Sequence, residues 1–143
     1  MIFLEKPAGF SPKIEVVSCF IEVKGKILLL HRQNHRPQGN TWGVPAGKVE
    51  KGEELEGAIR RELLEEIGYS PLASSLSYFN KVFIKYPDFD FIYHMFRCAL
   101  DAEPRIILAQ EEHKDYAWKT PEQALKMNLI PDEDPCIRLL YKI

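Results

Sequence analysis

The sequence predicts an α/β fold in which helices cover both faces of a mixed β-sheet. Runs of β-branched and aromatic residues, which are typical of strands, lie before and after one strongly helical stretch in the middle of the chain. Two further helical patterns follow near its end. The 143 residues contain no internal repeat, linker or low-complexity segment, so we expect a single domain over residues 1–143.

The composition argues against several classes of protein. A net charge of −2 gives no basic surface for long nucleic acid. No run approaches the roughly 20 apolar residues that span a bilayer, and the first residues lack the pattern of a signal peptide. The three cysteines are far apart, so we expect free thiols, and no His or Cys pair has zinc-ligand spacing. A cytoplasmic location is the default expectation.

The first part of the chain reads as a hairpin followed by a loop. After an irregular lead-in over residues 1–13, the run IEVVSCFIEV favours a strand, and Gly25 marks a tight turn. The run HRQNHRPQGN contains Pro, Gly and two Asn, which favour a loop. We expect strands at residues 14–23, 27–31 and 41–44, with the loop at 31–40.

The last part combines long strands with short helices. We expect strands at residues 76–86, 90–100, 105–108 and 116–119. Both faces of the second of these are largely apolar, so it should be a central strand covered on both sides. Thr120, Pro121 and Gln123 have the spacing of a helix start with a capping box, and this helix should run to about Lys126. A last helix should start at Asp134.

The helical stretch in the middle, Gly47 to Tyr69, reads GKVEKGEELEGAIRRELLEEIGY. We expect a helix over about Glu53–Ile67, in which an apolar stripe packs on the sheet. Three carboxylates at i, i+3 and i+4 share another face, which should point to a groove or to solvent: Glu62, Glu65 and Glu66. Like charges at this spacing are unfavourable. The face is therefore either a solvated acidic surface or a site for a hard cation such as Mg²⁺.

Two glycines accompany this acidic face. Gly47, before the helix, can bring its backbone carbonyl to an ion bound there. Gly57 lies inside the helix, where glycine costs about 0.8–1 kcal/mol relative to alanine. Close packing against the preceding loop is one reason to expect a glycine there.

The stretch resembles the Nudix box, in which Gly, five residues, Glu and seven residues precede Arg-Glu-aliphatic-x-Glu-Glu-x-Gly-aliphatic. The matching positions are Gly47, Glu53, Arg61, Glu62, Leu63, Glu65, Glu66 and Gly68. Tyr69 departs from the pattern, because an aliphatic residue is usual there. The preceding Arg32, Pro37, Gly39, Trp42 and Pro45 follow the order of the family's lead-in. The resemblance implies an α/β/α sandwich.

The resemblance also implies a metal site and a hydrolytic reaction. It indicates Mg²⁺, or Mn²⁺ in its place, held by Gly47, Glu62, Glu65, Glu66 and a further acid from a distant loop, Glu112. Glu62, Glu65 and Glu112 are the residues expected to act in catalysis, with His113 as an alternative base. Glu53 and Arg61 are expected to brace the site, against the alternative that they form salt bridges only.

The resemblance implies a nucleoside diphosphate linked to another group as the substrate, and a nucleoside triphosphate split into monophosphate and pyrophosphate is the first expectation. Alternatives are a nucleotide-sugar of the GDP-mannose or ADP-ribose type, a dinucleoside polyphosphate, or a non-catalytic nucleotide-sensing module. The intact box favours attack at phosphorus over attack at a sugar carbon. Arg32, Arg36 and Trp42 are the candidate substrate contacts, since guanidinium groups suit phosphates and an indole can stack on a base. Homodimers are common in the family.

Overall fold

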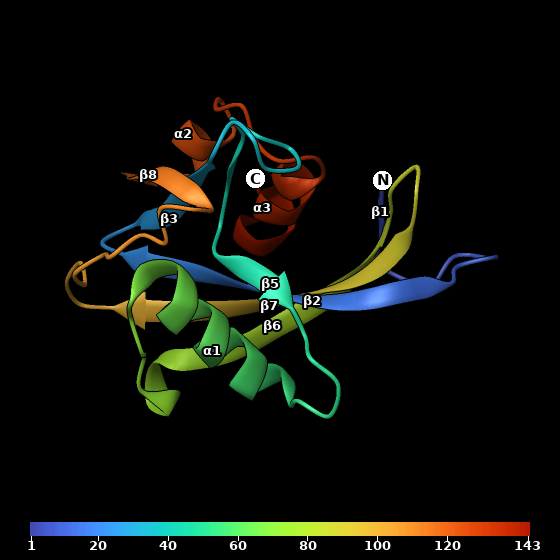
Figure 1. Cartoon of the computed structure of the whole chain (residues 1–143), viewed down its shortest axis with the longest axis horizontal. Coiled ribbons are helices and arrows are strands. Elements are labelled where there is room, and N and C mark those ends of the chain that lie inside the picture. The colour runs from blue at the N-terminus through green and yellow to red at the C-terminus, as the bar shows by residue number, and fades with distance from the viewer.

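The computed structural model describes all residues from Met1 to Ile143. Its strands form one mixed sheet in the order β1-β6-β7-β2-β3-β4, with β5 paired to β2 and β8 paired to β3. Figure 1 shows this sheet, whose elements are β1 (Ile2–Phe3), β2 (Pro12–Val23), β3 (Lys26–Arg32), β4 (Trp42–Gly43), β5 (Ala46–Lys48), β6 (Leu76–Lys85), β7 (Asp90–Leu100) and β8 (His113–Lys119).

Strand β7 lies at the centre of the sheet, as the sequence predicted for residues 90–100. It pairs in parallel with β2 and antiparallel with β6 along almost its whole length. Its alternating side chains enter two separate core clusters, with Tyr93 and Met95 in one and Phe96 and Cys98 in the other. A strand buried on both faces needs apolar residues at nearly every position, and this strand has them.

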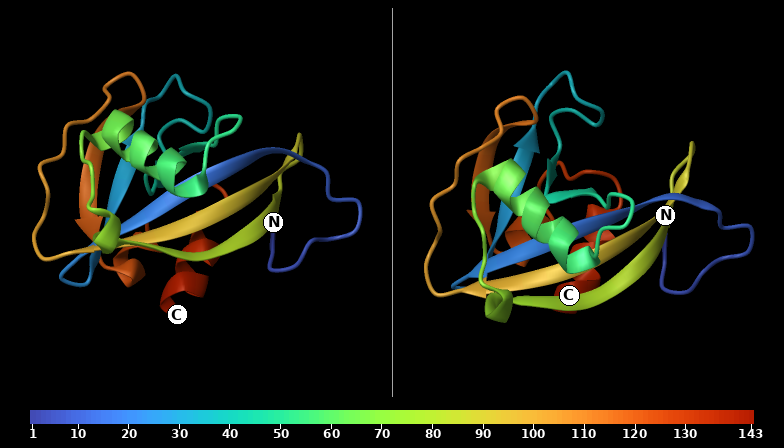
Figure 2. Two further views of the ribbon diagram at one scale, coloured as in Figure 1. Left: turned by 90° about the horizontal axis from the view of Figure 1, so that it is seen from below. Right: turned by 60° about the horizontal axis from the view of Figure 1, so that its bottom comes forward.

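Helices cover the two faces of the sheet. The helix α1 (Leu55–Ile67) packs on one face through Ile59, Leu63 and Ile67, which are fully buried. The helices α2 (Pro121–Ala124) and α3 (Glu133–Tyr141) follow β8 and cover the other face, where Ile137 and Leu140 are buried. Figure 2 shows α1 and α3 on opposite sides of the long strands. The predicted sandwich of helix, mixed sheet and helix is confirmed.

Most predicted elements occur within one or two residues of their expected bounds. The capping box of α2 is present, since the Thr120 side chain accepts from Gln123 N and the Gln123 side chain accepts from Thr120 N. This helix ends at Ala124, earlier than expected. The helix α1 begins at Leu55 rather than Glu53, because the backbone of Glu54 is extended and this residue is the N-cap.

Two predictions are wrong: that residues 105–108 form a strand, and that residues 1–13 are wholly irregular. No strand forms at 105–108. The backbone there follows the end of α1, with Ile107 N donating to Ile67 O and Ala109 N donating to Glu66 O, so its hydrogen bonds go to a helix end. Near the N-terminus, β1 pairs with β6, and β2 already begins at Pro12.

Two expectations from composition can be compared with the structure. The three cysteines are free and buried, as predicted. None of the helices is long and apolar enough to cross a membrane.

Candidate active site

The three glutamates on the acidic face of α1 range from buried to exposed. The carboxyl of Glu66 is only 4% exposed and accepts from Ala46 N at 3.3 Å. The side chain of Glu62 is 13% exposed, whereas that of Glu65 is 58% exposed. The three carboxyls therefore have different environments, although their spacing in the sequence is that of a single face.

Strand β5 approaches α1 so closely that Gly47 has to be a glycine. Gly47 pairs with Val17 of β2, which fixes its distance from the helix. A Cβ atom built on Gly47 would overlap the carboxylate of Glu62. Glycine is the residue that permits such an approach of backbone and side chain.

Arg61 connects the helix to the loop that precedes it. Its Nε and Nη2 donate to the two carboxylate oxygens of Glu53 at 2.8 and 2.9 Å, and Nη2 also donates to Lys48 O at 3.0 Å. Its Nη1 donates to Glu62 at 2.8 Å and to Glu65 at 3.3 Å. One guanidinium thus holds three acids of the helix and loop and a carbonyl of β5, as its planar fork of donors permits.

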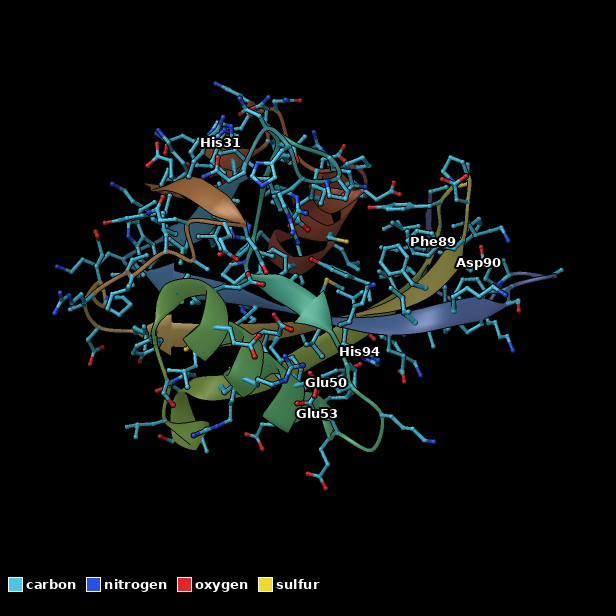
Figure 3. The ribbon with its side chains drawn as sticks, in the orientation of Figure 1. His31, Glu50, Glu53, Phe89, Asp90 and His94 are labelled. Atoms are coloured by element: carbon cyan, nitrogen blue, oxygen red, sulfur yellow. The ribbon has the colours of Figure 1, made fainter.

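Glu53 extends this connection to the start of the loop. Glu50 N donates to its carboxylate at 2.9 Å, and Figure 3 shows Glu50 and Glu53 together at the start of α1. The hydrogen bonds from Arg61 lower the pKa of Glu53 to about 2, so this carboxylate is charged under all ordinary conditions. The loop between β5 and α1 is consequently closed by a charge-assisted network.

Burial opposes negative charge at the inner end of the acidic face. Burial raises the pKa of Glu66 well above its usual value, and the charges of Glu62 and Glu112 raise it further. Burial also raises the pKa of Glu62, although Arg61 partly offsets it. A nearby positive charge would remove this penalty and favour the ionised carboxylates.

The distant acid Glu112 reaches this site on the loop before β8. That loop is attached to α1 by the bond from Ala109 N to Glu66 O, and it turns back on itself through Glu112 N and His113 N, which both donate to Ala109 O. The charge of Glu112 acts on Glu66, so the two carboxyls are neighbours. Glu111, by contrast, is exposed.

His113 is buried at 5% exposure, and its Nδ1 has no hydrogen-bond partner. Burial, together with the charges of Arg32 and Arg36, lowers the pKa of His113 to about 4. The imidazole is therefore neutral at physiological pH. The residue lines a cavity, although Nδ1 itself has almost no exposed surface.

A cavity of about 260 Å³ lies beside these groups. Glu66, His113 and Arg32 lie along its wall, together with Lys48 from β5. The rest of the wall is largely apolar and aromatic, formed by Ile14, Val16, Ile84, Tyr86, Phe89, Phe91 and Tyr93 among others. A concave, mainly apolar space with a few polar groups is typical of a small-molecule site.

The comparisons with known proteins agree with this geometry. The family model of the NUDIX domain matches residues 12–140, which is most of the chain. The chain belongs to the Nudix family. The CTP pyrophosphohydrolase of Escherichia coli strain K12 is 32% identical over 126 residues, which cover 87% of this chain and 88% of that protein. The predicted recognition is thus confirmed, and the chain is a Nudix hydrolase.

Two further relatives are informative. The nucleoside triphosphatase NudI of Salmonella typhimurium strain LT2 is 35% identical over 91 residues, covering 57% of this chain and 63% of that protein. The solution structure of the E. coli ORF135 protein is similar to this fold with a TM-score of 0.77 and 30% identity, covering 95% of this chain and 94% of that one. The similarity extends well beyond the Nudix box to nearly the whole chain.

The residues of the Nudix box fit a hard cation in their chemistry. Glu62, Glu66 and Glu112 supply carboxylate oxygens, and the glycine at position 47 lets the backbone lie against the carboxylate of Glu62. In this structure Arg61 holds Glu62 and Glu65, and no three acidic, histidine or cysteine side chains converge tightly enough to enclose an ion. Binding an ion would therefore require side-chain rotations at these two glutamates.

The predicted substrate contacts are not all at the cavity of the Nudix hydrolase. Arg32 lines it, with its Nε donating to Pro37 O at 2.9 Å. Arg36 is exposed and is not part of the wall, although its charge acts on His113. Trp42 is outside the wall too, because its ring stacks on His31 with centroids 4.2 Å apart and planes inclined by 6°.

The sequence analysis missed Glu133, a buried acid in the wall of the cavity. Its carboxyl is 3% exposed and accepts from Val44 N at 2.9 Å and from the Tyr93 hydroxyl at 3.1 Å. Burial raises the pKa of Glu133 to about 7. An acid in the first turn of a helix is ordinarily a surface residue, so the sequence contained no signal that would have singled it out.

Proposed function

We propose that this Nudix hydrolase splits a nucleoside triphosphate into a nucleoside monophosphate and pyrophosphate in a metal-dependent reaction. The observation that carries the proposal is the cavity, whose wall contains Glu66 of the Nudix box, the cations Arg32 and Lys48, and a largely apolar and aromatic remainder. A ligand that carries both phosphates and an aromatic heterocycle suits such a space. The names of the two curated relatives, a CTP pyrophosphohydrolase and a nucleoside triphosphatase, support the same class.

Gly47, Glu62, Glu65, Glu66 and Glu112 would hold the metal, Mg²⁺ or Mn²⁺ in its place. Their carboxylate and carbonyl oxygens are the donors that such hard cations prefer. When bound, the ion would neutralise phosphate charge and lower the pKa of water. Two structural features support this assignment: the raised pKa of Glu66 and the overlap that any Cβ on Gly47 would produce.

The cations along the cavity would bind and orient the phosphates. Arg32 and Lys48 lie in its wall, and Arg36 adds positive charge nearby. Holding the substrate in line with the attacking water accounts for a large part of such catalysis. Arg61 and Glu53 would act as a brace that fixes β5 relative to α1.

Glu112 is the favoured candidate for the general base. The carboxylate of Glu65 is held by Arg61. The Nδ1 of His113 is buried and has almost no exposed surface, which makes this imidazole a poor base. The carboxylate of Glu112 makes no hydrogen bond or ion pair, and its loop is bonded to Glu66 through Ala109 N. His113 would instead form part of the wall of the cavity.

The aromatic part of the cavity would receive the nucleobase. Tyr86, Phe89 and Phe91 provide this aromatic surface, and Figure 3 shows Phe89 at the turn between β6 and β7. Glu133 is a buried acid of the same wall. This arrangement replaces Trp42 as the expected stacking surface.

The proposal is tested with a substrate panel measured with Mg²⁺ and with EDTA. It contains the four common ribonucleoside triphosphates and their deoxy forms, ADP-ribose, GDP-mannose and diadenosine tetraphosphate. Products are identified by mass in ¹⁸O-labelled water, which shows whether phosphorus or carbon is attacked. Metal-dependent release of pyrophosphate from a triphosphate is the expected result. Turnover confined to another arm of the panel, or binding without turnover, would reject the triphosphate reaction.

A further inference from the structure

The loop that carries Glu112 is held on two sides. On the side of α1, Ala109 N donates to Glu66 O at 3.2 Å and Ile107 N donates to Ile67 O at 2.9 Å. No helix or strand lies between the end of β7 and the start of β8. The loop is therefore held by its hydrogen bonds to α1 and to the end of β3. The carboxylate of Glu112 makes no bond of its own. Its position therefore depends entirely on how the backbone is held.

On the other side Gln33 makes two hydrogen bonds to the loop, just before the point where Arg32 pairs with His113 at the start of β8. The backbone N–H of Gln33 donates to Glu112 O at 2.9 Å, and its side-chain Nε2 donates to Gln110 O at 2.8 Å. Both bonds go to carbonyls within the turn that presents Glu112. Gln33 is half-buried at the end of β3, a rigid central element, so it is a firm point of attachment.

Gln33 also begins the segment that lies over the cavity. Residues 33–41 connect β3 to β4, and Gln38 of this segment lines the cavity, as does Arg32 immediately before it. A β-bulge lies at the same point, because His31 pairs with Asp115 while Arg32 pairs with His113. Bulges re-aim side chains and occur often beside active sites. The segment that meets the substrate and the loop that carries the acid are thus joined at Gln33.

We propose that Gln33 is a positioning residue, which holds Glu112 in place beside Glu66 and links it to the segment over the cavity. This inference rests on the proposed function, in which Glu112 takes part in metal binding or proton transfer. A displacement of about 1 Å at a reacting group can reduce a rate by about a hundredfold. A single side-chain hydrogen bond at the base of a flexible turn can therefore matter greatly for turnover.

The main test is Gln33→Met, which keeps the length and packing of the side chain and removes only its hydrogen bond. We expect kcat to fall by about ten- to a hundredfold with a smaller change in KM, because the substrate contacts remain. In a Glu112→Gln background the same substitution should have little further effect, since Gln33 acts through Glu112. Full additivity of the two losses, or an unchanged kcat in Gln33→Met, would overturn the proposal.

The matched control is Thr41→Val, which removes another side-chain bond within the same segment. The Thr41 hydroxyl donates to Gln38 O at 2.7 Å and does not contact the loop of Glu112. We expect this variant to retain the wild-type kcat in the same assay. An equal loss of kcat in both variants would mean that the segment over the cavity, and not Gln33 itself, is responsible.

A second readout needs neither metal nor substrate. Amide hydrogen exchange at Glu112 and His113 should become about tenfold faster in Gln33→Met but not in Thr41→Val, because the turn loses one of its attachments. If wild-type protein turns over no substrate, the proposed function fails, while the exchange rates still decide whether Gln33 holds the turn. Unchanged exchange in Gln33→Met would overturn the proposal.

Discussion

Two buried glutamates, Glu66 and Glu133, line the cavity. Each has a raised pKa because its carboxyl is removed from water. Glu66 lies among other acids, whereas Glu133 lies between a backbone N–H and a tyrosine hydroxyl. Groups with strongly shifted pKa values in a cleft are often functional, because folding alone gives no reason to bury them. Both residues therefore provide direct tests of the site.

The first test is Glu66→Gln. The fold should survive, because a neutral amide can still accept from Ala46 N. Turnover should fall by at least about a hundredfold, since even the outer partners of metal ligands are worth 10–100-fold. Without metal, the variant should melt at a higher temperature than wild type at neutral pH, because a group with a raised pKa destabilises the fold once it ionises. Steady-state kinetics and thermal melting measure the two effects.

The control for this variant is Glu56→Gln, which changes an exposed acid on the same helix. It should leave both turnover and the melting temperature nearly unchanged. Wild-type turnover in Glu66→Gln at saturating Mg²⁺ would remove Glu66 from the site.

The second test uses the pH dependence of stability at Glu133. Its pKa rises from 4.5 in the unfolded chain to about 7 in the fold. Its contribution to stability is therefore complete below about pH 4.5, declines as the pH rises and is lost above about pH 7, a difference on the order of 3 kcal/mol. Urea unfolding of wild type and Glu133→Gln at pH 5 and pH 8 should show a smaller loss of stability with rising pH in the variant.

Glu122→Gln, at an exposed position of α2, should retain the wild-type pH dependence. Equal slopes for wild type and Glu133→Gln would show that the fold does not raise the pKa of Glu133.

Among the elements, the pair formed by β5 and α1 determines the geometry of the acidic face. The strand is placed by its pairing with β2, the helix by its apolar stripe, and Arg61 ties the two together. Within this pair two glycines have different roles. Gly47 has no room for a side chain, but a Cβ on Gly57 would meet nothing within 4 Å. The expectation of close packing at Gly57 was wrong, because this position of the helix faces solvent.

This difference gives a matched pair of variants. Gly47→Ala should displace Glu62, lower stability by about 1–3 kcal/mol through overpacking and reduce turnover strongly. Gly57→Ala should raise stability by about 0.8–1 kcal/mol and leave turnover unchanged, since alanine favours the helix. Chemical unfolding and kinetics on both proteins check the prediction. A Gly47→Ala enzyme with normal turnover would show that the close approach has no functional role.

At the scale of the whole molecule, metal binding should stabilise the fold. Without a cation, the raised pKa values of Glu62 and Glu66 report carboxylates that are costly to ionise in the folded state. An ion that binds the native state and not the unfolded chain raises stability by mass action, and at ten times its Kd the gain is about 1.4 kcal/mol. For a chain of 143 residues this is a rise in melting temperature of about 4 °C.

Differential scanning calorimetry with and without millimolar Mg²⁺ measures this rise. Glu66→Gln should show a much smaller one, because the variant lacks one ligand. Equal shifts in both proteins would place the bound ion elsewhere on the molecule.

The sequence by itself determined the family, the sandwich of helices around a mixed sheet, and the local elements. Local patterns were sufficient here, because strand alternation, helix periodicity and the capping box at Thr120 depend on residues near one another in the chain. The match to the Nudix box predicted the acids of α1. The resemblance to the family also predicted Glu112, in a loop outside the box. The single domain over residues 1–143, the dimer and the location in the cell stay predictions.

Only the tertiary structure decided which of these residues share a site. It brought Glu112 next to Glu66, placed Arg32 in the cavity wall and excluded Trp42 from it. It also revealed Glu133 and Gln33, which carry no distinguishing local pattern. Their importance comes from burial and from hydrogen bonds to residues 40 or more positions away in the sequence. Such contacts depend on how the sheet is assembled, and a linear pattern of side chains does not record them.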